Sequence, residues 1–276
     1  MATLAKTART VARSETGRKM LNKVPEVTLY FWIIKIMCTT VGETAADYLN
    51  VDLGFGLTKT TYVAGGLLIV LLAIQLRLKK YVPAVYWMCV VVISVFGTLI
   101  TDNLSDKAGV PLTTSTIVFA VALALVFAAW YWSERTLSIH TIFTTRRELF
   151  YWLAILFTFA LGTAAGDLFA EKMALGYFPS ALIFGGLIAI IAVGHFAFKF
   201  NAVLAFWVAY ILTRPLGASI GDELSQTKHA GGLGLGTTNT SYIFLGCILA
   251  LVTYLSITRR DQTPPVEVAA SDVAAG

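Results

Sequence analysis

The sequence has little charge and few residues of the kinds that build soluble catalytic sites. Only 13% of its 276 residues are charged, whereas a soluble domain carries roughly 25%. It has 3 cysteines and 3 histidines, and neither set shows the spacing of a zinc or haem site. We find no Ser/His/Asp, Cys/His or metal-hydrolase pattern, so we expect no enzyme and no cofactor.

Hydrophobic residues are abundant instead, at 57% of the chain, with a mean hydropathy of +0.74. Apolar stretches recur along the sequence, and a membrane-crossing helix needs about 20 such residues. They predict an all-α, polytopic membrane protein with eight transmembrane helices. The first helix, from Val27 to about Asp47, is the least apolar because Lys35 and Glu43 interrupt it.

One pattern occurs four times without a gap: an aromatic residue, Trp, nine residues, Gly, four residues and Asp. Alternate copies lie 120 residues apart, so the chain is a duplicated half that is itself a duplicated helix pair. The predicted repeats cover about 25–80, 81–135, 146–199 and 201–260. Because each repeat has two spans, all copies are parallel, and the first helices of the repeats can face one axis. The repeated residues are Trp32, Trp87, Trp152 and Trp207; Gly42, Gly97, Gly162 and Gly217; and Asp47, Asp102, Asp167 and Asp222.

Basic residues are distributed unevenly between the two sides of the predicted bundle. Fifteen lie in the N-terminal stretch and in alternate loops, whereas the remaining loops hold four, namely Lys59, Lys107, Lys172 and Lys228. The positive-inside rule therefore places both termini in the cytoplasm. We expect residues 1–24 to be a cytosolic basic tail, residues 25–260 a transmembrane domain and residues 261–276 a disordered tail. The predicted partner is the lipid bilayer and not nucleic acid; a homo-oligomer is left open.

The repeat also resembles a known family. With Cys38 to Asp47 as its fullest copy, it is similar to a bacterial family of uncharacterised membrane proteins defined by four tandem repeats of unknown function, each with two transmembrane segments and a tryptophan. The resemblance covers about residues 25–260 and implies an inner-membrane location. It implies little about activity. The third copy departs slightly, with Phe169 where the others have leucine.

A polar stripe runs along these first helices, at three, seven, eleven and fifteen residues after each Trp. Polar residues on an apolar helix face protein or water rather than lipid, and the glycines lie off this stripe, where they let helices approach. The four aspartates fall near the outer end, as a ring of carboxylates for cations or as helix ends. Glu43 is the strongest single candidate, as a substrate ligand or in an ion pair with Arg214 or Lys35. Pro215 predicts a break after Arg214, and the tryptophans an aromatic belt near the inner surface.

These features favour a secondary transporter that exports a small cation between the first helices of the repeats. Glu43, Asp47, Asp102, Asp167 and Asp222 would bind the substrate or exchange protons. Lys35 and Arg214 would be internal counter-ions. Carboxylates suit Mn²⁺, Mg²⁺ or Ca²⁺; manganese is the leading guess, with Glu43, Asp47 and Asp167 as its ligands. Two alternatives remain: a transporter of a small organic or anionic solute that uses Lys35 and Arg214, and a membrane scaffold or signalling protein without transport.

Overall fold

The computed structural model describes residues 22–262 of the protein, and within them the fold is all-α. The expectations for residues 1–21 and 263–276 lie outside the described residues. Short π-helical turns extend three of the helices, and short 3-10 turns lie in two loops. The long helices are α2 (Leu29–Asp47), α3 (Gly56–Arg77), α4 (Pro83–Asp102), α5 (Leu112–Glu134), α6 (Thr145–Asp167), α7 (Tyr177–Phe198), α8 (Ala202–Ser225) and α9 (Thr237–Thr258).

Local sequence signals fix several helix ends. The hydroxyl of Thr28 accepts a hydrogen bond from the Phe31 amide at the start of α2, and the Asn201 side chain caps α8 in the same way. Pro83 occupies the first turn of α4, where its missing N–H is not needed. These signals fix where α2, α4 and α8 begin.

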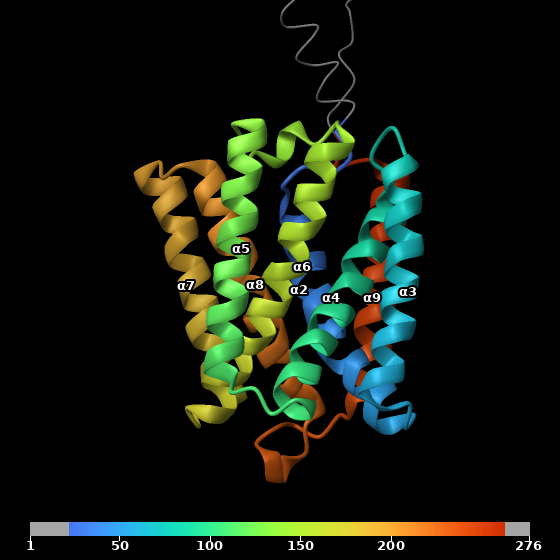
Figure 1. Ribbon diagram of the computed structural model, residues 1–276, viewed down its shortest axis with the longest axis vertical. Coiled ribbons are helices and arrows are strands. Elements are labelled where there is room, and N and C mark those ends of the chain that lie inside the picture. Colours follow the sequence, from blue (N-terminus) through green and yellow to red (C-terminus); the bar gives the residue numbers. More distant parts are fainter. Residues whose placement is uncertain (1–21, 263–276) are drawn as a thin grey trace, which may run out of the picture.

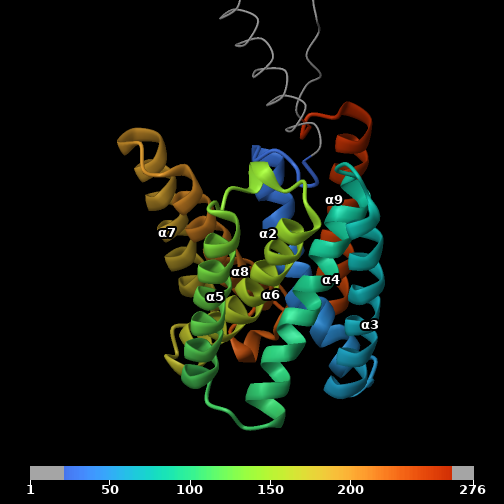
Figure 2. The same ribbon diagram turned by 45° about the horizontal axis from the view of Figure 1, so that its top comes forward.

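The first helices of the repeats, α2, α4, α6 and α8, form a closed inner ring. Neighbours in chain order pack against each other, and α8 packs back against α2. Each second helix packs on the first helix of the following repeat: α3 on α4, α5 on α6 and α7 on α8. The last helix, α9, completes the cycle on α2 (Figures 1 and 2). The same set of helix contacts therefore recurs four times around the ring, once for each sequence repeat.

The repeated glycine is the contact point of each seam in the inner ring. Each one lies against the residue seven positions after the Trp of the next repeat. A Cβ atom added there would fall between 2.5 and 2.7 Å from the Cβ of that neighbour, closer than real Cβ atoms approach. The small residue lets two helices pack closely. The pairs are Gly42 with Ser94, Gly97 with Phe159, Gly162 with Arg214 and Gly217 with Thr39.

Seven helices of the described chain are long and apolar enough to cross a membrane: α3, α4, α5, α6, α7, α8 and α9. The eighth, α2, is the most polar, as the sequence indicates. Two of its charged residues, Lys35 and Glu43, are nevertheless buried, because α4, α8 and α9 surround it, whereas Asp47 at its end is half-buried. Lys35 is fully buried and Glu43 is 7% exposed.

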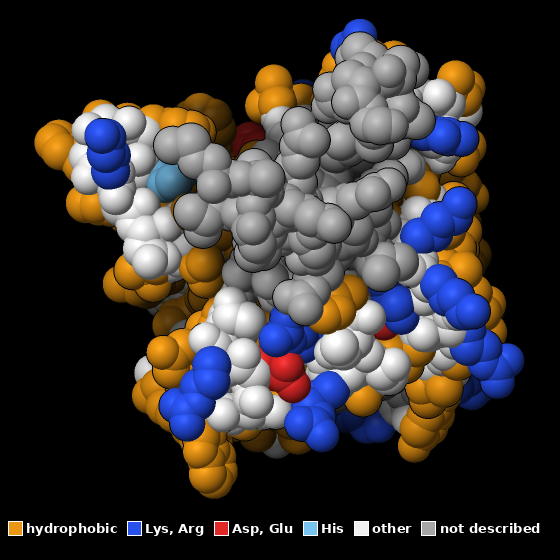
Figure 3. Space-filling model, turned by 90° about the horizontal axis from the view of Figure 1, so that it is seen from above, with side chains coloured by type: hydrophobic (Ala, Val, Ile, Leu, Met, Phe, Trp, Pro, Cys, Tyr) orange, Lys and Arg blue, Asp and Glu red, His pale blue; other side chains and the backbone are white. Residues whose placement is uncertain are grey.

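The end of the bundle at which α2 begins is rich in basic side chains (Figure 3). At this end, residues outside the predicted transmembrane domain pack into the protein, whereas the sequence predicts solvated tails. Asn22, Lys23 and Val24 are buried, although the sequence assigns them to the cytosolic tail. Asp261, expected in the disordered tail, is 1% exposed and accepts a hydrogen bond of 2.6 Å from the Tyr81 hydroxyl. The described residues next to the predicted tail boundaries thus pack into the protein, and the boundaries themselves stay predictions.

Candidate functional site

A buried guanidinium joins all four inner helices. The Arg214 side chain of α8 is fully buried, and its Nη2 donates to Glu43 Oε2 of α2 at 2.8 Å. Nη1 donates to the backbone carbonyl of Thr39, also on α2, at 2.7 Å. Nη2 also donates to the hydroxyls of Thr98 on α4 and Thr163 on α6, the latter at 2.8 Å. Each inner helix thus contributes a group to one cluster.

The cluster follows the repeat. Arg214 lies seven residues after Trp207, whereas Glu43, Thr98 and Thr163 each lie eleven residues after the Trp of their own repeat. Cyclic packing brings these equivalent positions around one axis. Three repeats therefore present an oxygen at the same place, and the fourth supplies the cation that binds them.

Geometry explains why an arginine fits here. A Cβ at Gly162 would lie 2.5 Å from the Cβ of Arg214, so the glycine of α6 makes room for the side chain. A planar guanidinium can donate to several acceptors at once, which a lysine ammonium does less well. A buried ion pair is costly unless its hydrogen bonds are satisfied; here four acceptors contact Nη1 and Nη2 of Arg214, whereas its Nε has no hydrogen-bond partner among the described residues.

The second buried cation of the inner helices, Lys35, has a different environment. Its Nζ lies 4.0 Å from the ring centroid of Phe159 and 4.2 Å from that of Tyr210. In the part of the chain that the structure describes, this ammonium has no hydrogen-bond partner. Of the two predicted partners for Glu43, the structure therefore selects Arg214 and places Lys35 between aromatic rings.

The four repeated aspartates lie at the end of the bundle away from the basic face. Asp47, Asp102 and Asp167 are the last residues of α2, α4 and α6, and Asp222 lies in the last turn of α8. The Asp102 carboxyl interacts electrostatically with Glu43, Asp47 and Arg214. This side of the cluster is thus acidic.

The structure does not assemble the predicted metal ligands. Among the described residues, no group of three or more His, Cys, Asp or Glu side chains could hold a metal ion. Glu43, Asp47 and Asp167 accordingly form no such group. Glu43 is instead engaged by Arg214.

The structure bears on two further interpretations. Trp87, Trp152 and Trp207 are at most 4% exposed and pack inside the bundle, whereas Trp32 is half-buried, so three of the four repeated tryptophans are covered by protein. Trp152, for example, packs 5.5 Å from the Tyr86 ring. Pro215 does not break α8, because the helix runs uninterrupted through it.

A second buried ion pair escaped the sequence analysis. Lys23 Nζ donates to Glu148 Oε2 at 2.6 Å and to the Leu76 carbonyl at 3.0 Å. Gln75 Nε2 donates to the other Glu148 oxygen at 3.0 Å. The only available sequence signal was Glu148, an acid in the first turn of a helix that begins with basic residues. An acid at this place is also common because it interacts favourably with the helix dipole.

Comparison with known proteins supports the repeat architecture. Residues 30–81, 85–136, 150–200 and 205–261 each match the family described as Repeat of Unknown Function (DUF347). These bounds agree with the predicted repeats to within a few residues. No curated protein and no solved structure matches the chain. The matched segments cover most of the sequence, and the chain belongs to this four-repeat family of unknown function.

Proposed function

We propose that the protein spans the bacterial inner membrane with all eight helices and keeps both termini in the cytoplasm. Seven helices have the length and hydropathy of membrane spans. The eighth, α2, is enclosed by three of them, so its charges need not face lipid. Basic residues are concentrated at the end of the bundle at which α2 begins, and this supports a cytoplasmic position for that end (Figure 3).

We further propose that the protein is a secondary transporter of a small cation, whose path follows the axis of the inner ring. The observation that carries this proposal is the Arg214–Glu43 pair at the meeting point of four parallel helices. Ionisable groups inside spans are costly and mark substrate or ion pathways. Glu43 would exchange between two partners: Arg214, as in the arrangement described above, and the cation when α8 moves away.

The acidic side of the cluster favours a hard divalent cation as substrate. Asp102 lies in electrostatic range of both Glu43 and Asp47, on the side opposite the basic face. A small divalent ion that keeps several waters needs only one or two carboxylates, which suits an ion passing a site without three protein ligands. Manganese remains the first ion to test, with magnesium and calcium beside it, and export is the proposed direction.

Proteoliposomes test this proposal. Purified protein is reconstituted with an indicator for Mn²⁺, Mg²⁺ or Ca²⁺, and flux is compared among wild type, E43Q and the control K172Q, whose side chain is exposed near the outer end. We expect flux in wild type and K172Q and at least about a tenfold loss in E43Q, since a charge-bearing ligand is removed. Absence of flux for every cation would exclude this function.

One observation favours a second candidate, a transporter of a small anionic solute. Lys35 is fully buried without a hydrogen-bond acceptor in the described chain, and it lies on the basic-face side of Arg214. Two cations in sequence along the axis could bind a carboxylate or phosphate. R214Q would then abolish uptake of the anion while D222N would leave it intact, whereas a cation path requires the carboxylates.

A further inference from the structure

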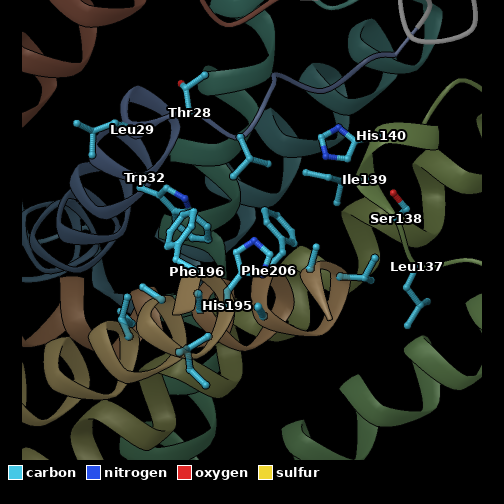
Figure 4. A pocket seen from close by; sticks show the side chains of 18 residues that line it. Thr28, Leu29, Trp32, Leu137, Ser138, Ile139, His140, His195, Phe196 and Phe206 are labelled. Carbon is cyan, nitrogen blue, oxygen red and sulfur yellow. The ribbon is translucent and has the colours of Figure 1, made fainter. Parts of the chain in front are cut away.

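A cavity of about 550 Å³ lies between α7, the start of α2 and the first half of α8, near the basic face (Figure 4). Its walls include Trp32, Ile188, Phe196 and Phe206, and they are mostly hydrocarbon and aromatic. His140 and His195 are among its few polar residues. The volume falls in the usual range of about 300–1,000 Å³ for ligand sites.

This cavity replaces a contact that the other second helices make. In α3 and α5, five inward positions are buried, at 0, 4, 8, 11 and 15 residues from a small hydroxyl residue (Thr60 or Ser115). In α7 the first two, Ser180 and Phe184, are buried in the same way. The remaining three are only half-buried and line the cavity: Ile188, Ile191 and His195.

Side-chain size explains the difference. In α5, Phe127 and Trp130 pack on the Trp207 indole, with ring centroids 4.9 and 5.8 Å away. The positions 65 residues later, one repeat on, are Ala192 and His195, and they face the equivalent tryptophan, Trp32, across the cavity. Ala192 thus has a methyl group where Phe127 has a phenyl ring, and His195 has an imidazole where Trp130 has an indole.

We propose that this cavity binds the acyl chain of an anionic amphiphile, with a carboxylate or phosphate at its polar end. The proposal rests on the membrane insertion proposed above, because the cavity then lies beside the inner leaflet, next to α7, whose exposed apolar residues would face lipid. Apolar walls suit the chain. The polar end has charge complementarity, since Lys199 is exposed at the end of α7 and other Lys and Arg side chains surround this face (Figure 3).

His195 is oriented for such a ligand. Its Nδ1 lies 3.0 Å from the Phe200 carbonyl oxygen. A carbonyl can only accept, so Nδ1 donates; in the neutral ring Nε2 is then an acceptor, and it donates to an anionic headgroup only in the imidazolium form. Oleate and an anionic phospholipid both combine an acyl chain with an anionic headgroup. Oleate is a free fatty acid, whereas the phospholipid is a component of the bilayer.

Native mass spectrometry of delipidated protein tests the proposal with three probes: oleate, dioleoyl phosphatidylglycerol and dioleoyl phosphatidylcholine. The double variant A192F/H195W reproduces the face of α5 and fills the cavity. We expect wild type to retain one anionic amphiphile and the double variant to retain it about tenfold less, since each excluded methylene weakens binding about fourfold. The matched control A189F adds the same ring on the exposed face of α7 and keeps wild-type retention.

Equal retention by wild type and A192F/H195W, or none by wild type, would overturn the proposal. Equal retention of all three probes would overturn the role proposed for the headgroup. A wild-type dimer that dissociates when the cavity is filled would also overturn the proposal, because a second copy of the chain would then be the occupant. The single variant A192F decides the outcome if the double variant does not fold. Retention is measured without transport, so a failure of the cation proposal leaves this result unchanged, and the relative retention of oleate and phosphatidylglycerol identifies the source.

Discussion

The protein contains two buried ion pairs that differ in how they are built. Arg214 and Glu43 lie at the axis, where equivalent positions of the four repeats meet. Lys23 and Glu148 lie at the basic end, where the segment before α2 contacts α3 and α6. The first pair uses positions that the repeat defines, whereas the second uses residue types that the other repeats do not share.

This difference separates two tasks of charge inside the bundle. The axial pair joins four helices that glycine seams already hold together, so packing alone does not require its charges. The pair at the basic end adds to the contacts that attach the segment before α2 to its surroundings, such as the hydrogen bond from the Lys23 amide to the Ile142 carbonyl, which is a structural task. Variants at the two pairs should therefore have different consequences.

The largest effect is expected at the axis. R214Q leaves the Glu43 carboxylate buried without its counter-ion, which typically costs about 3–5 kcal/mol of unfolding free energy. Thermal and denaturant unfolding in detergent measure this loss. The double variant R214Q/E43Q should recover a large part of it, because both charges are removed together. A double variant as unstable as R214Q would show that the pair itself is not the reason.

A smaller effect is expected at the basic end. K23Q removes one donor to Glu148, but Gln75 still donates to that carboxylate, so we expect a loss of about 1–3 kcal/mol. The same unfolding measurement applies, and flux in proteoliposomes should stay at the wild-type level. Lys199, exposed at the end of α7, offers a matched control as K199Q with no change in stability. Loss of flux in K23Q at full stability would contradict the separation of tasks.

The smallest effect concerns Asp261, also at the basic end. Burial raises the pKa of this carboxyl above its ordinary value, and the hydrogen bond from Tyr81 offsets part of that rise. Its contribution to stability is therefore present at acid pH and is lost as the pH rises through the raised pKa. We expect the unfolding temperature of wild type to fall slightly relative to D261N between about pH 4 and about pH 7. Parallel curves for the two proteins would contradict the pKa direction.

Much of the architecture followed from periodicity. The four-fold Trp–Gly–Asp spacing predicted the parallel repeats, and the stripe predicted that Lys35, Glu43 and Arg214 face the interior. Periodicity defines a helix face but not the order of helices around an axis. The choice of Arg214 rather than Lys35 as partner of Glu43 depends on α8 lying next to α2, which only the ring closure supplies.

Other features depend on tertiary packing that no local pattern encodes. An aromatic–Trp pair is typical both of a membrane interface and of a bundle core, so burial of Trp87 could not be inferred. Lys23 belongs to a basic stretch, and its burial depends on Glu148, which lies 125 residues away. The cavity beside α7 becomes evident only when the side-chain sizes of Trp130 and His195, which occupy equivalent positions of two repeats, are compared.

The glycine seams have a consequence for symmetry. Four identical two-helix subunits could form the same ring of seams, but they would place four copies of one side chain at each level of the axis. Such an assembly could not set a lone guanidinium against a lone carboxylate, because every charge would meet its own kind. Fusion into one chain lets Gly162 accommodate Arg214 while Gly42 still faces a serine. The continuous chain thus breaks the symmetry of charge while it keeps the symmetry of shape.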